Sequence, residues 1–362
     1  MATPTVVLLP VWGAGHLMPM LEAGKRLLAG TGRALSLTVL VMPPPTEQQA
    51  SEVEGHIRRE EAAAAAAGLD VRFHSLPAVE PPTDHAGPVE FISRVVQLHL
   101  PHARAAIAGL PCPVAALLLD LFCTEMLDAS RDLAVLPASY VYFTCNAAAL
   151  SFFLRLPALH EEVSGEFAEM DGAVDLPGLP PVPPSCLPTA IMDRAKPCCA
   201  WYTYHGRRFM DADGIIVNTA AELEPRVLSA IADGRWCTRG IRPPALYPIG
   251  PMISFGPPAE HPHECVRWLD AQPPASVVLL CFGSGGFFAA PQAHEVARGL
   301  ERSGHRFLWV LRGPPAAGGG RQPTDGSCSQ RASSSGRRRR GSCGRRGRRR
   351  RKSSATPPWG GS

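Results

Sequence analysis

Residues 5–28 read TVVLLPVWGAGHLMPMLEAGKRLL, and this stretch decides the fold. Its first seven residues form an apolar run that predicts a short buried strand. The glycines at positions 13 and 15 then predict a tight turn that opens a helix. The apolar residues of that helix recur on one side, at Leu17, Met20, Leu21, Leu27 and Leu28. A strand that turns through glycines into an amphipathic helix is the first half of a βαβ unit.

The chain then repeats this alternation of strands and helices. Apolar, β-branched runs predict further strands at 35–42, 71–74, 114–119, 138–143, 214–217 and 245–249. Helical spacing or composition predicts helices at 47–67, 91–107, 123–133, 147–156, 200–210 and 222–232. The Pro-rich residues 176–188 are predicted to form a surface loop. This order favours a doubly wound α/β domain with a parallel sheet.

A second unit of the same kind starts after residues 251–263, whose prolines and glycines are typical of a linker. It has helices predicted at 263–271 and 291–302 and strands predicted at 276–282 and 306–311. We therefore expect an N-terminal domain over 1–250, the linker over 251–263, and the start of a second α/β domain over 264–312.

The composition is that of an ordinary globular protein: 45% of the 362 residues are hydrophobic and 19% are charged, which allows two domains. The eleven cysteines have no metal-ligand spacing, so we expect free thiols in a reducing compartment and no metal. The apolar run at 6–11 is too short for a signal peptide. Proline and polar residues interrupt the longest uncharged stretch, 134–154, which favours a buried strand and helix over a membrane span. We expect a cytoplasmic protein with no membrane partner.

The formal net charge of +4 is unevenly distributed along the chain. Residues 321–362 carry twelve Arg and one Lys against Asp325, a charge of +12, which leaves −8 for residues 1–320. After Leu311 the sequence has no Leu, Ile, Val, Phe, Met or Tyr. We therefore expect nothing beyond Leu311 to bury a core or extend a sheet, and we predict a disordered tail over 313–362.

The Arg-rich tail has two interpretations. Its runs at 337–340 and 348–352 can contact the phosphates of nucleic acid, but the segment has no Phe or Tyr for base stacking and only one Trp, Trp359. Its composition is also what GC-rich coding DNA gives when it is read out of frame. We favour a frame change between about residues 318 and 326 and do not expect nucleic acid as a partner. A transcript in which no single insertion or deletion restores family-like sequence would contradict this hypothesis.

The fold class itself predicts a candidate site. In the common strand order of doubly wound sheets, the connection reverses between the first and fourth strands, and ligands bind outside their carboxyl ends. His16 follows the first strand and Asp120 ends the fourth, so we predict that they share one crevice. A carboxylate bonded to an imidazole stabilises its charged form, which is the arrangement of an oriented general base. The alternative is that both residues only cap helices, and their spacing leaves both interpretations open.

A dinucleotide site is a rival use of the same turn, because Gly13-x-Gly15 follows a strand and opens a helix. The third glycine position of that fingerprint is Met18, and the second strand ends at Met42-Pro43 with no acidic residue for a ribose. This pattern disfavours a nicotinamide or flavin enzyme.

Several segments together resemble the plant family 1 UDP-dependent glycosyltransferases, which transfer sugars to small lipophilic acceptors. The resemblance runs from residue 4 to about residue 323, and its motifs lie at 7–22, 118–123, 141–144, 213–223, 247–251, 280–285 and 305–310. It implies a GT-B type α/β fold, in which two Rossmann-like doubly wound domains face each other and the second is incomplete here. The N-terminal domain would bind the acceptor, and the C-terminal domain would bind the UDP-sugar.

The resemblance also implies roles for single residues. His16 would deprotonate the acceptor hydroxyl, and Asp120 would orient His16 and stabilise its charged form. Trp12 would bind the acceptor together with His16. The donor-binding residues that it implies are Gly15, Thr144, Gly283, Ser284 and Gly285. The expected reaction transfers a hexose, most simply glucose, to a hydroxyl of an acceptor such as a flavonoid, with inversion. The UDP-sugar is then a co-substrate, no cofactor or metal is required, and we expect a monomer.

The second domain departs from the family pattern. The family's donor box starts Trp-Ala-Pro-Gln, continues as His-Cys-Gly-Trp-Asn-Ser and ends Asp-Gln, and none of these strings occurs in the sequence. The resemblance assigns the contacts to uracil, ribose and most of the diphosphate to that box. We therefore expect a truncated second domain and impaired transfer. The alternative is a non-catalytic remnant that binds small acceptors or, through its tail, nucleic acid.

Overall fold

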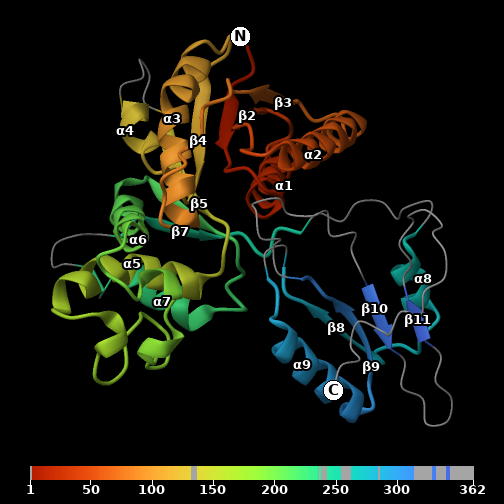
Figure 1. Ribbon diagram of the computed structural model, residues 1–362. Coiled ribbons are helices and arrows are strands. Elements are labelled where there is room, and N and C mark those ends of the chain that lie inside the picture. Colours follow the sequence, from red (N-terminus) through yellow and green to blue (C-terminus); the bar gives the residue numbers. More distant parts are fainter. Residues whose placement is uncertain are drawn as a thin grey trace. The chain divides into compact units, whose positions relative to one another are not determined.

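The computed structural model describes residues 2–131, 137–234, 236–237, 243–253, 262–283 and 286–313, with the backbone alone at 48, 129–131, 328–331 and 340–342. Internal contacts divide the chain into two compact units, Met1–Phe255 and Gly256–Ser362. Each unit contains its own sheet (Figure 1).

The first unit is built on a seven-stranded sheet with the order β3-β2-β1-β4-β5-β6-β7, in which every pair is parallel. Its strands are β1 (Thr5–Leu9), β2 (Ser36–Val41), β3 (Val71–Ser75), β4 (Val114–Asp120), β5 (Ala138–Phe143), β6 (Gly214–Val217) and β7 (Ala245–Pro248). β1 lies between β2 and β4, with Leu9 beside Leu119. The predicted parallel α/β sheet, with its reversal between the first and fourth strands, is therefore confirmed.

Helices follow most of these strands, close to the predicted positions. They are α1 (Ala14–Gly30), α2 (Glu47–Ala66), α3 (Pro88–Ala108), α4 (Met126–Arg131), α5 (Ala147–Glu162), α6 (Pro197–Arg208) and α7 (Pro225–Ala232). Single 3-10 turns flank α6, at η1 (Phe167–Glu169), η2 (Pro184–Cys186), η3 (Thr189–Ile191) and η4 (Phe209–Asp211). α7 starts three residues later than predicted because Pro225 occupies its first turn, where the missing N–H costs no hydrogen bond. α4 also starts three residues later, because residues 121–125, which follow β4, form a turn.

β1 is apolar from Val6 to Leu9 because apolar side chains cover both faces of the sheet. Val6 and Leu8 belong to one buried cluster, which also holds the apolar side of α1. Val7 and Leu9 belong to a second cluster, which holds the buried sides of α3 and α5. Successive side chains of a strand point to opposite faces, so a strand covered on both sides needs a continuous apolar run.

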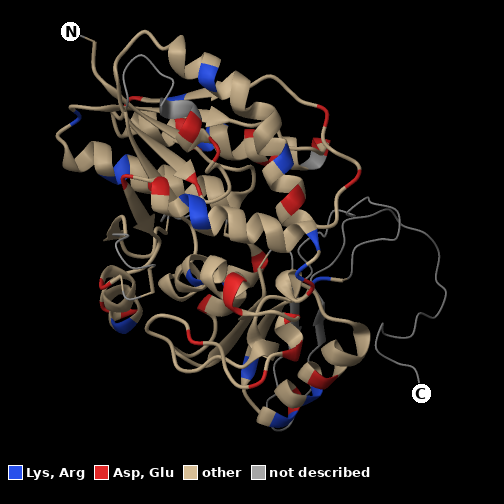
Figure 2. Ribbon diagram, turned by 90° about the vertical axis from the view of Figure 1, so that its left-hand side faces the viewer, with Lys and Arg blue, Asp and Glu red and all other residues tan. Residues whose placement is uncertain are grey.

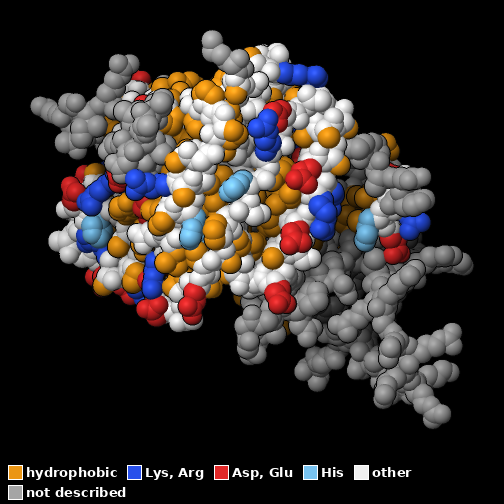
Figure 3. All heavy atoms as spheres, turned by 90° about the horizontal axis from the view of Figure 1, so that it is seen from above, with side chains coloured by type: hydrophobic (Ala, Val, Ile, Leu, Met, Phe, Trp, Pro, Cys, Tyr) orange, Lys and Arg blue, Asp and Glu red, His pale blue; other side chains and the backbone are white. Residues whose placement is uncertain are grey.

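Lys or Arg and Asp or Glu residues both occur along the helices (Figure 2). The face drawn in Figure 3 likewise has acidic and basic groups between its apolar side chains. Within the uncharged stretch 134–154, β5 runs into α5, whose first turn is capped by the Asn146 side chain accepting from Ala149 N–H at 3.0 Å. The predicted strand and helix are confirmed there. Among the described residues, no helix has both the length and the apolar character to cross a bilayer.

The second unit begins with the elements expected of an α/β domain. They are α8 (Glu264–Asp270), β8 (Val277–Cys281), α9 (Ala290–Ser303) and β9 (Arg306–Val310). β8 pairs parallel with β9, and the buried side chains of Ala293, Phe307 and Trp309 join α9 to β9.

The sheet of the second unit continues past Leu311, contrary to our expectation. β10 (Cys328–Arg331) pairs antiparallel with β9, and β11 (Arg340–Ser342) pairs antiparallel with β10. Backbone N–H and C=O groups form these ladders, and every residue except proline carries both groups, so strand pairing needs no apolar side chains. The prediction that nothing beyond Leu311 extends a sheet is wrong for these seven residues, and the rest of 314–362 lies outside the described residues.

Candidate active site

Gly13 turns the chain from β1 into α1. It is the N-cap of α1 with φ 109° and ψ 141°, a region that side-chain-bearing residues avoid and glycine adopts freely. Its carbonyl accepts hydrogen bonds from the backbone N–H groups of His16 (3.1 Å) and Leu17 (3.0 Å). His16 therefore lies in the first turn of α1, just beyond the carboxyl end of β1.

β4 brings Asp120 to the same edge of the sheet, and the two side chains meet. His16 Nδ1 lies 2.7 Å from Asp120 Oδ2, a hydrogen bond between residues 104 positions apart in the sequence. Asp120 is fully buried, and its other oxygen, Oδ1, accepts from Phe122 N–H at 3.1 Å. The structure thus brings together the pair that topology predicted.

The capping alternative accounts for only part of this geometry. The N-cap of α1 is Gly13 and not His16. The carbonyl of Asp120 does accept from Cys123 N–H at 2.7 Å, so Asp120 also stabilises the turn that precedes α4. One carboxylate oxygen therefore fixes this turn, while the other contacts the imidazole.

Asp120 sets the protonation of His16. Burial alone lowers the pKa of His16, but the negative charge and hydrogen bond of Asp120 outweigh it, so that the pKa is raised above 6.5. In neutral His16, donation of Nδ1–H to the carboxylate leaves the lone pair on Nε2. The side chain is 26% exposed, so an incoming hydroxyl can reach it. The pair has the chemistry of a general base whose charged form is stabilised.

An aromatic side chain lies beside the imidazole, and a second precedes it in the sequence. The ring of Phe122 contacts His16, with centroids 5.9 Å apart and planes tilted by 41°. Trp12, four residues before His16, packs edge-on against Phe91 of α3 at 6.1 Å. Trp12 also lines a pocket with Pro10, Val11, Leu17, Val41, Met42 and Val53. Phe122 is buried beside the candidate base, whereas Trp12 is partly exposed, and sequence reasoning assigned no role to Phe122.

Thr144 and Gly15 lie at the same edge of the sheet. Thr144 directly follows β5, in which Tyr142 is the register partner of Asp120. Gly15 is exposed in the first turn of α1, and a Cβ added there would meet no atom within 4 Å. Packing therefore does not require a glycine at position 15, and the surface of α1 at Gly15, next to His16 in the sequence, is open.

Asn218, which sequence reasoning missed, ties Thr144 to the last described segment of the first unit. Its Nδ2 donates to the Thr144 carbonyl at 3.1 Å, and its Oδ1 accepts from Met252 N–H at 2.7 Å. Asn218 directly follows β6 and lies inside the motif at 213–223. The motif therefore predicts where Asn218 lies in the sheet, but not which groups its side chain contacts.

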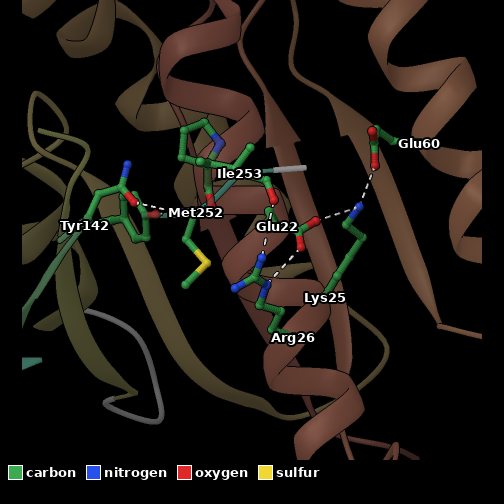
Figure 4. A network of polar contacts seen from close by, with 9 residues as sticks. Glu22, Lys25, Arg26, Glu60, Tyr142, Met252 and Ile253 are labelled. Atoms are coloured by element: carbon green, nitrogen blue, oxygen red, sulfur yellow. Dashed lines mark hydrogen bonds and ion pairs between the residues drawn. The ribbon is translucent and has the colours of Figure 1, made fainter. Parts of the chain in front are cut away.

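Arg26 of α1 holds Ile253, the residue after Met252. Its guanidinium donates a hydrogen bond to the Ile253 carbonyl at 3.3 Å (Figure 4). Glu22 bonds both Arg26 (2.9 Å) and Lys25 (3.1 Å), and Lys25 reaches Glu60 of α2 at 2.8 Å. The helix that carries the candidate base therefore also anchors the chain where the first unit ends.

Glu224 was also missed, and it occupies the start of α5. Its carboxylate accepts from the N–H groups of Ala147 (2.9 Å) and Ala148 (3.0 Å). Together with the Asn146 cap, it satisfies three of the free donors at this helix terminus. These donors are therefore engaged within the chain and hold the turn that follows Thr144.

The candidate donor loop of the second unit is described only in part. Gly283 follows β8 with φ +75°, which suits a glycine at this turn. Ser284 and Gly285 lie outside the described residues. In the described part of the chain, no group of three His, Cys, Asp or Glu side chains is arranged to hold a metal ion.

Comparison with known proteins identifies the family. No family model matches the chain. Over 322 residues it is 35% identical to UDP-glycosyltransferase 88B1 of Stevia rebaudiana, a match that covers 87% of this chain and 67% of that protein. The chain belongs to the plant UDP-dependent glycosyltransferases. The predicted GT-B type α/β fold is likewise confirmed by similar solved structures, among them Medicago truncatula UGT71G1 complexed with UDP-glucose, with a TM-score of 0.70 and 29% identity over 86% of this chain and 67% of that one.

Other members of this glycosyltransferase family are similar in sequence and structure. The chain is 61% identical over 317 residues to malvidin galactosylase UGT88C3 of Oryza sativa subsp. japonica, and the match spans 87% of this chain but 64% of that enzyme. The structure of Phytolacca americana UGT2, complexed with UDP-2-fluoro-glucose and pterostilbene, matches with a TM-score of 0.71 and 33% identity. That match covers 86% of this chain and 67% of the other.

Proposed function

We propose that this chain transfers a hexose from a UDP-sugar to a hydroxyl group of a small phenolic acceptor, with inversion at the anomeric carbon. The observation that carries the proposal is the 2.7 Å contact between His16 Nδ1 and the buried Asp120 carboxylate at the switch point of the sheet. Membership in the glycosyltransferase family supplies the reaction class.

His16 Nε2 takes the proton of the acceptor hydroxyl in the proposed step. The acceptor oxygen forms a bond to the anomeric carbon while the bond from that carbon to the UDP oxygen breaks, and UDP leaves with the electron pair. Asp120 keeps Nδ1 protonated and stabilises the imidazolium that forms. A positioned base typically contributes about 100-fold to 10,000-fold to the rate.

Aromatic groups beside His16 support a phenolic acceptor. Phe122 lies against the imidazole, and Trp12 comes four residues before His16, ahead of the N-cap of α1. The similar proteins point to the same class: one is a malvidin galactosylase, one is an anthocyanidin 5,3-O-glucosyltransferase, and one structure holds pterostilbene. Because these names include both a galactosyl and a glucosyl enzyme, the sugar is proposed only as a hexose.

In the proposed division of labour, residues 1–250 bind the acceptor and residues 264–312 contribute to the UDP-sugar site. Gly15 and Thr144 would face the donor from the first unit, and Gly283, Ser284 and Gly285 would face the diphosphate from the second. Backbone N–H groups at a glycine-rich turn can stabilise the charge on a leaving diphosphate. We further propose a cytoplasmic monomer without a nucleic-acid partner. Nine free thiols among the described cysteines are compatible with a reducing compartment.

The test is turnover of UDP-glucose and UDP-galactose by the full chain with a panel of flavonoid and anthocyanidin acceptors. His16→Ala is expected to lower the rate by about 100-fold to 10,000-fold. His56→Ala removes a partly exposed histidine from α2, outside the proposed site, and is the matched control, which should keep the rate. An unchanged rate in His16→Ala would contradict the role of His16.

The second candidate function is acceptor binding without transfer, and the absence of the donor-box strings from the 362 residues favours it. In that case both the wild type and His16→Ala would show no turnover, while a flavonoid still quenches the fluorescence of Trp12 and the other tryptophans. Turnover by the wild type would exclude this candidate.

A further inference from the structure

A second histidine lies behind the candidate site and is not used by the proposed reaction. His205, on α6, is fully buried. Its Nε2 lies 2.8 Å from Ser93 Oγ of α3, and its Nδ1 lies 2.8 Å from Thr124 Oγ1, in the turn that follows Asp120. One imidazole therefore joins two helices and the turn that carries the candidate carboxylate.

The hydrogen bonds of Ser93 determine which nitrogen of His205 carries the proton. The Ser93 hydroxyl has one proton, which it donates to the Val89 carbonyl at 2.8 Å. It must therefore accept from His205 Nε2–H, which leaves Nδ1 as an acceptor for the Thr124 hydroxyl. Burial lowers the pKa of His205 to about 3, so the neutral ring that this pattern requires is the form present near neutral pH.

The ring of His205 also packs against the turn. Phe122 meets it edge-on, with centroids 5.5 Å apart, and the Phe122 ring also contacts His16. Trp201 stacks on His205 at 5.7 Å and 27°. His205 thus contacts residues 120–124 in two ways: its Nδ1 is bonded to the Thr124 hydroxyl, and its ring packs against Phe122, which also contacts His16.

We propose that His205 is a positioning residue that holds residues 120–124 so that the Asp120 carboxylate and the Phe122 ring remain against His16. The inference rests on the proposed role of His16. The backbone N–H of Phe122 bonds Asp120 Oδ1, so a shift of Phe122 or Thr124 moves the carboxylate directly. Partners that orient a reacting side chain in this way set its geometry without touching the substrate.

The competing explanation is that His205 has a purely structural role. Variants of its two hydroxyl partners, Thr124 and Ser93, distinguish this explanation from the positioning role. Thr124→Val and Ser93→Ala each remove one hydrogen bond to the same buried ring, with little change in shape. Only Thr124 lies in the turn that directly follows Asp120, because Ser93 lies on α3. A structural role therefore predicts equal effects at His16, and a positioning role predicts an effect from Thr124→Val alone.

The experiment is an NMR titration of the full chain labelled with ¹³C at histidine Cε1, with the His16 signal assigned by its loss in His16→Gln. We expect Thr124→Val to lower the pKa of His16 towards 6.5, Ser93→Ala to leave it unchanged, and Thr124→Ser to restore the wild-type value. Thermal unfolding of the same variants should show similar losses for Thr124→Val and Ser93→Ala.

Equal shifts of the His16 titration in both variants, or no shift in either, would overturn the proposal and leave His205 as a core residue. The readout does not depend on turnover. If His16 is not the base, His16→Gln keeps its transferase activity, whereas the comparison between Thr124→Val and Ser93→Ala still decides what His205 does.

Discussion

His16 and His205 both bond through a ring nitrogen at 2.7 to 2.8 Å, yet their pKa values shift in opposite directions. Burial disfavours the charged form of both rings. At His16 the charge and hydrogen bond of Asp120 reverse that effect and raise the pKa, whereas at His205 the partners are neutral hydroxyls and the pKa falls to about 3. The charge of the partner, more than the depth of burial, therefore separates a candidate base from a fixed neutral ring.

The largest effect is expected from removal of that charge. Asp120→Asn keeps the shape of the side chain, but burial then acts alone on His16, so its pKa should fall below 6.5. Turnover should fall by about 100-fold to 10,000-fold, because the imidazolium loses its partner and the tautomer is no longer fixed. A histidine titration by NMR and the rate of hexosyl transfer measure the two effects.

Asp171→Asn is the control for this variant, since Asp171 is exposed in a loop and is not part of the proposed site. It should leave both quantities unchanged. A His16 pKa that stays raised in Asp120→Asn would show that another group sets it and would remove the contrast with His205.

Each histidine has a neighbouring glycine, and these glycines provide the next test. Pro157 lacks the N–H that would bond the Phe153 carbonyl within α5, and Gly206 of α6 approaches that carbonyl closely. A Cβ at position 206 would overlap the Phe153 carbonyl oxygen and lie 3.3 Å from Pro157, whereas a Cβ at position 15 would meet nothing within 4 Å.

We therefore expect Gly206→Ala to lower the free energy of unfolding by about 1–3 kcal/mol through overpacking next to His205. Gly15→Ala should leave it unchanged or raise it by up to about 1 kcal/mol, because alanine favours the helix. Urea denaturation of both variants checks this. Equal stabilities of the two variants would show that α6 can move away from α5. That result would contradict the inference that packing holds His205 in a fixed position.

The sequence predicted one of these two histidine sites and not the other, for a physical reason. The contact between His16 and Asp120 follows from strand order alone, because the carboxyl ends of β1 and β4 must be neighbours in a doubly wound sheet. The contacts of His205 depend on how α3, α6 and the turn at 120–124 pack, and helical spacing does not specify which buried side chains meet across elements.

The same distinction explains the other differences from expectation. Apolar runs predicted the strands of the first unit because both faces of its sheet are buried. β10 and β11 have no such runs, and the backbone hydrogen bonds that pair strands are available to nearly every sequence, so this pairing leaves no signal in the residues. The helix predicted at 123–133 starts only at Met126, because residues 121–125 form a turn that is bonded to Asp120. A spacing pattern does not show such a hydrogen bond.

The two histidines should also affect stability at different pH, and His205 should have the larger effect. Its folded pKa of about 3 lies below the unfolded value of 6.5, so the unfolded chain binds one more proton between these values. Its contribution is present above pH 6.5 and is lost as the pH falls, at about 1.4 kcal/mol per pH unit.

His205→Gln removes this titration and keeps one donor and one acceptor in the site. The free energy of unfolding of the variant should therefore decline less steeply than that of the wild type between pH 6 and pH 4.5. Some decline should remain, because burial also lowers the pKa of His99 on α3, to about 4. Parallel stability curves for the two proteins would mean that His205 is protonated in the folded state.

His16 should give a smaller effect of opposite sign. Its folded pKa is raised above the unfolded value of 6.5, so the folded chain binds more protons, and the stabilisation by Asp120 is complete below pH 6.5. It is lost as the pH rises through the folded pKa, and solvent screens it because the imidazole is 26% exposed. Urea unfolding should show a larger advantage of the wild type over His16→Gln at pH 6 than at pH 9. An advantage that is equal at both pH values would mean that Asp120 orients His16 without stabilising its charge, and the two histidines would then differ only in their access to solvent.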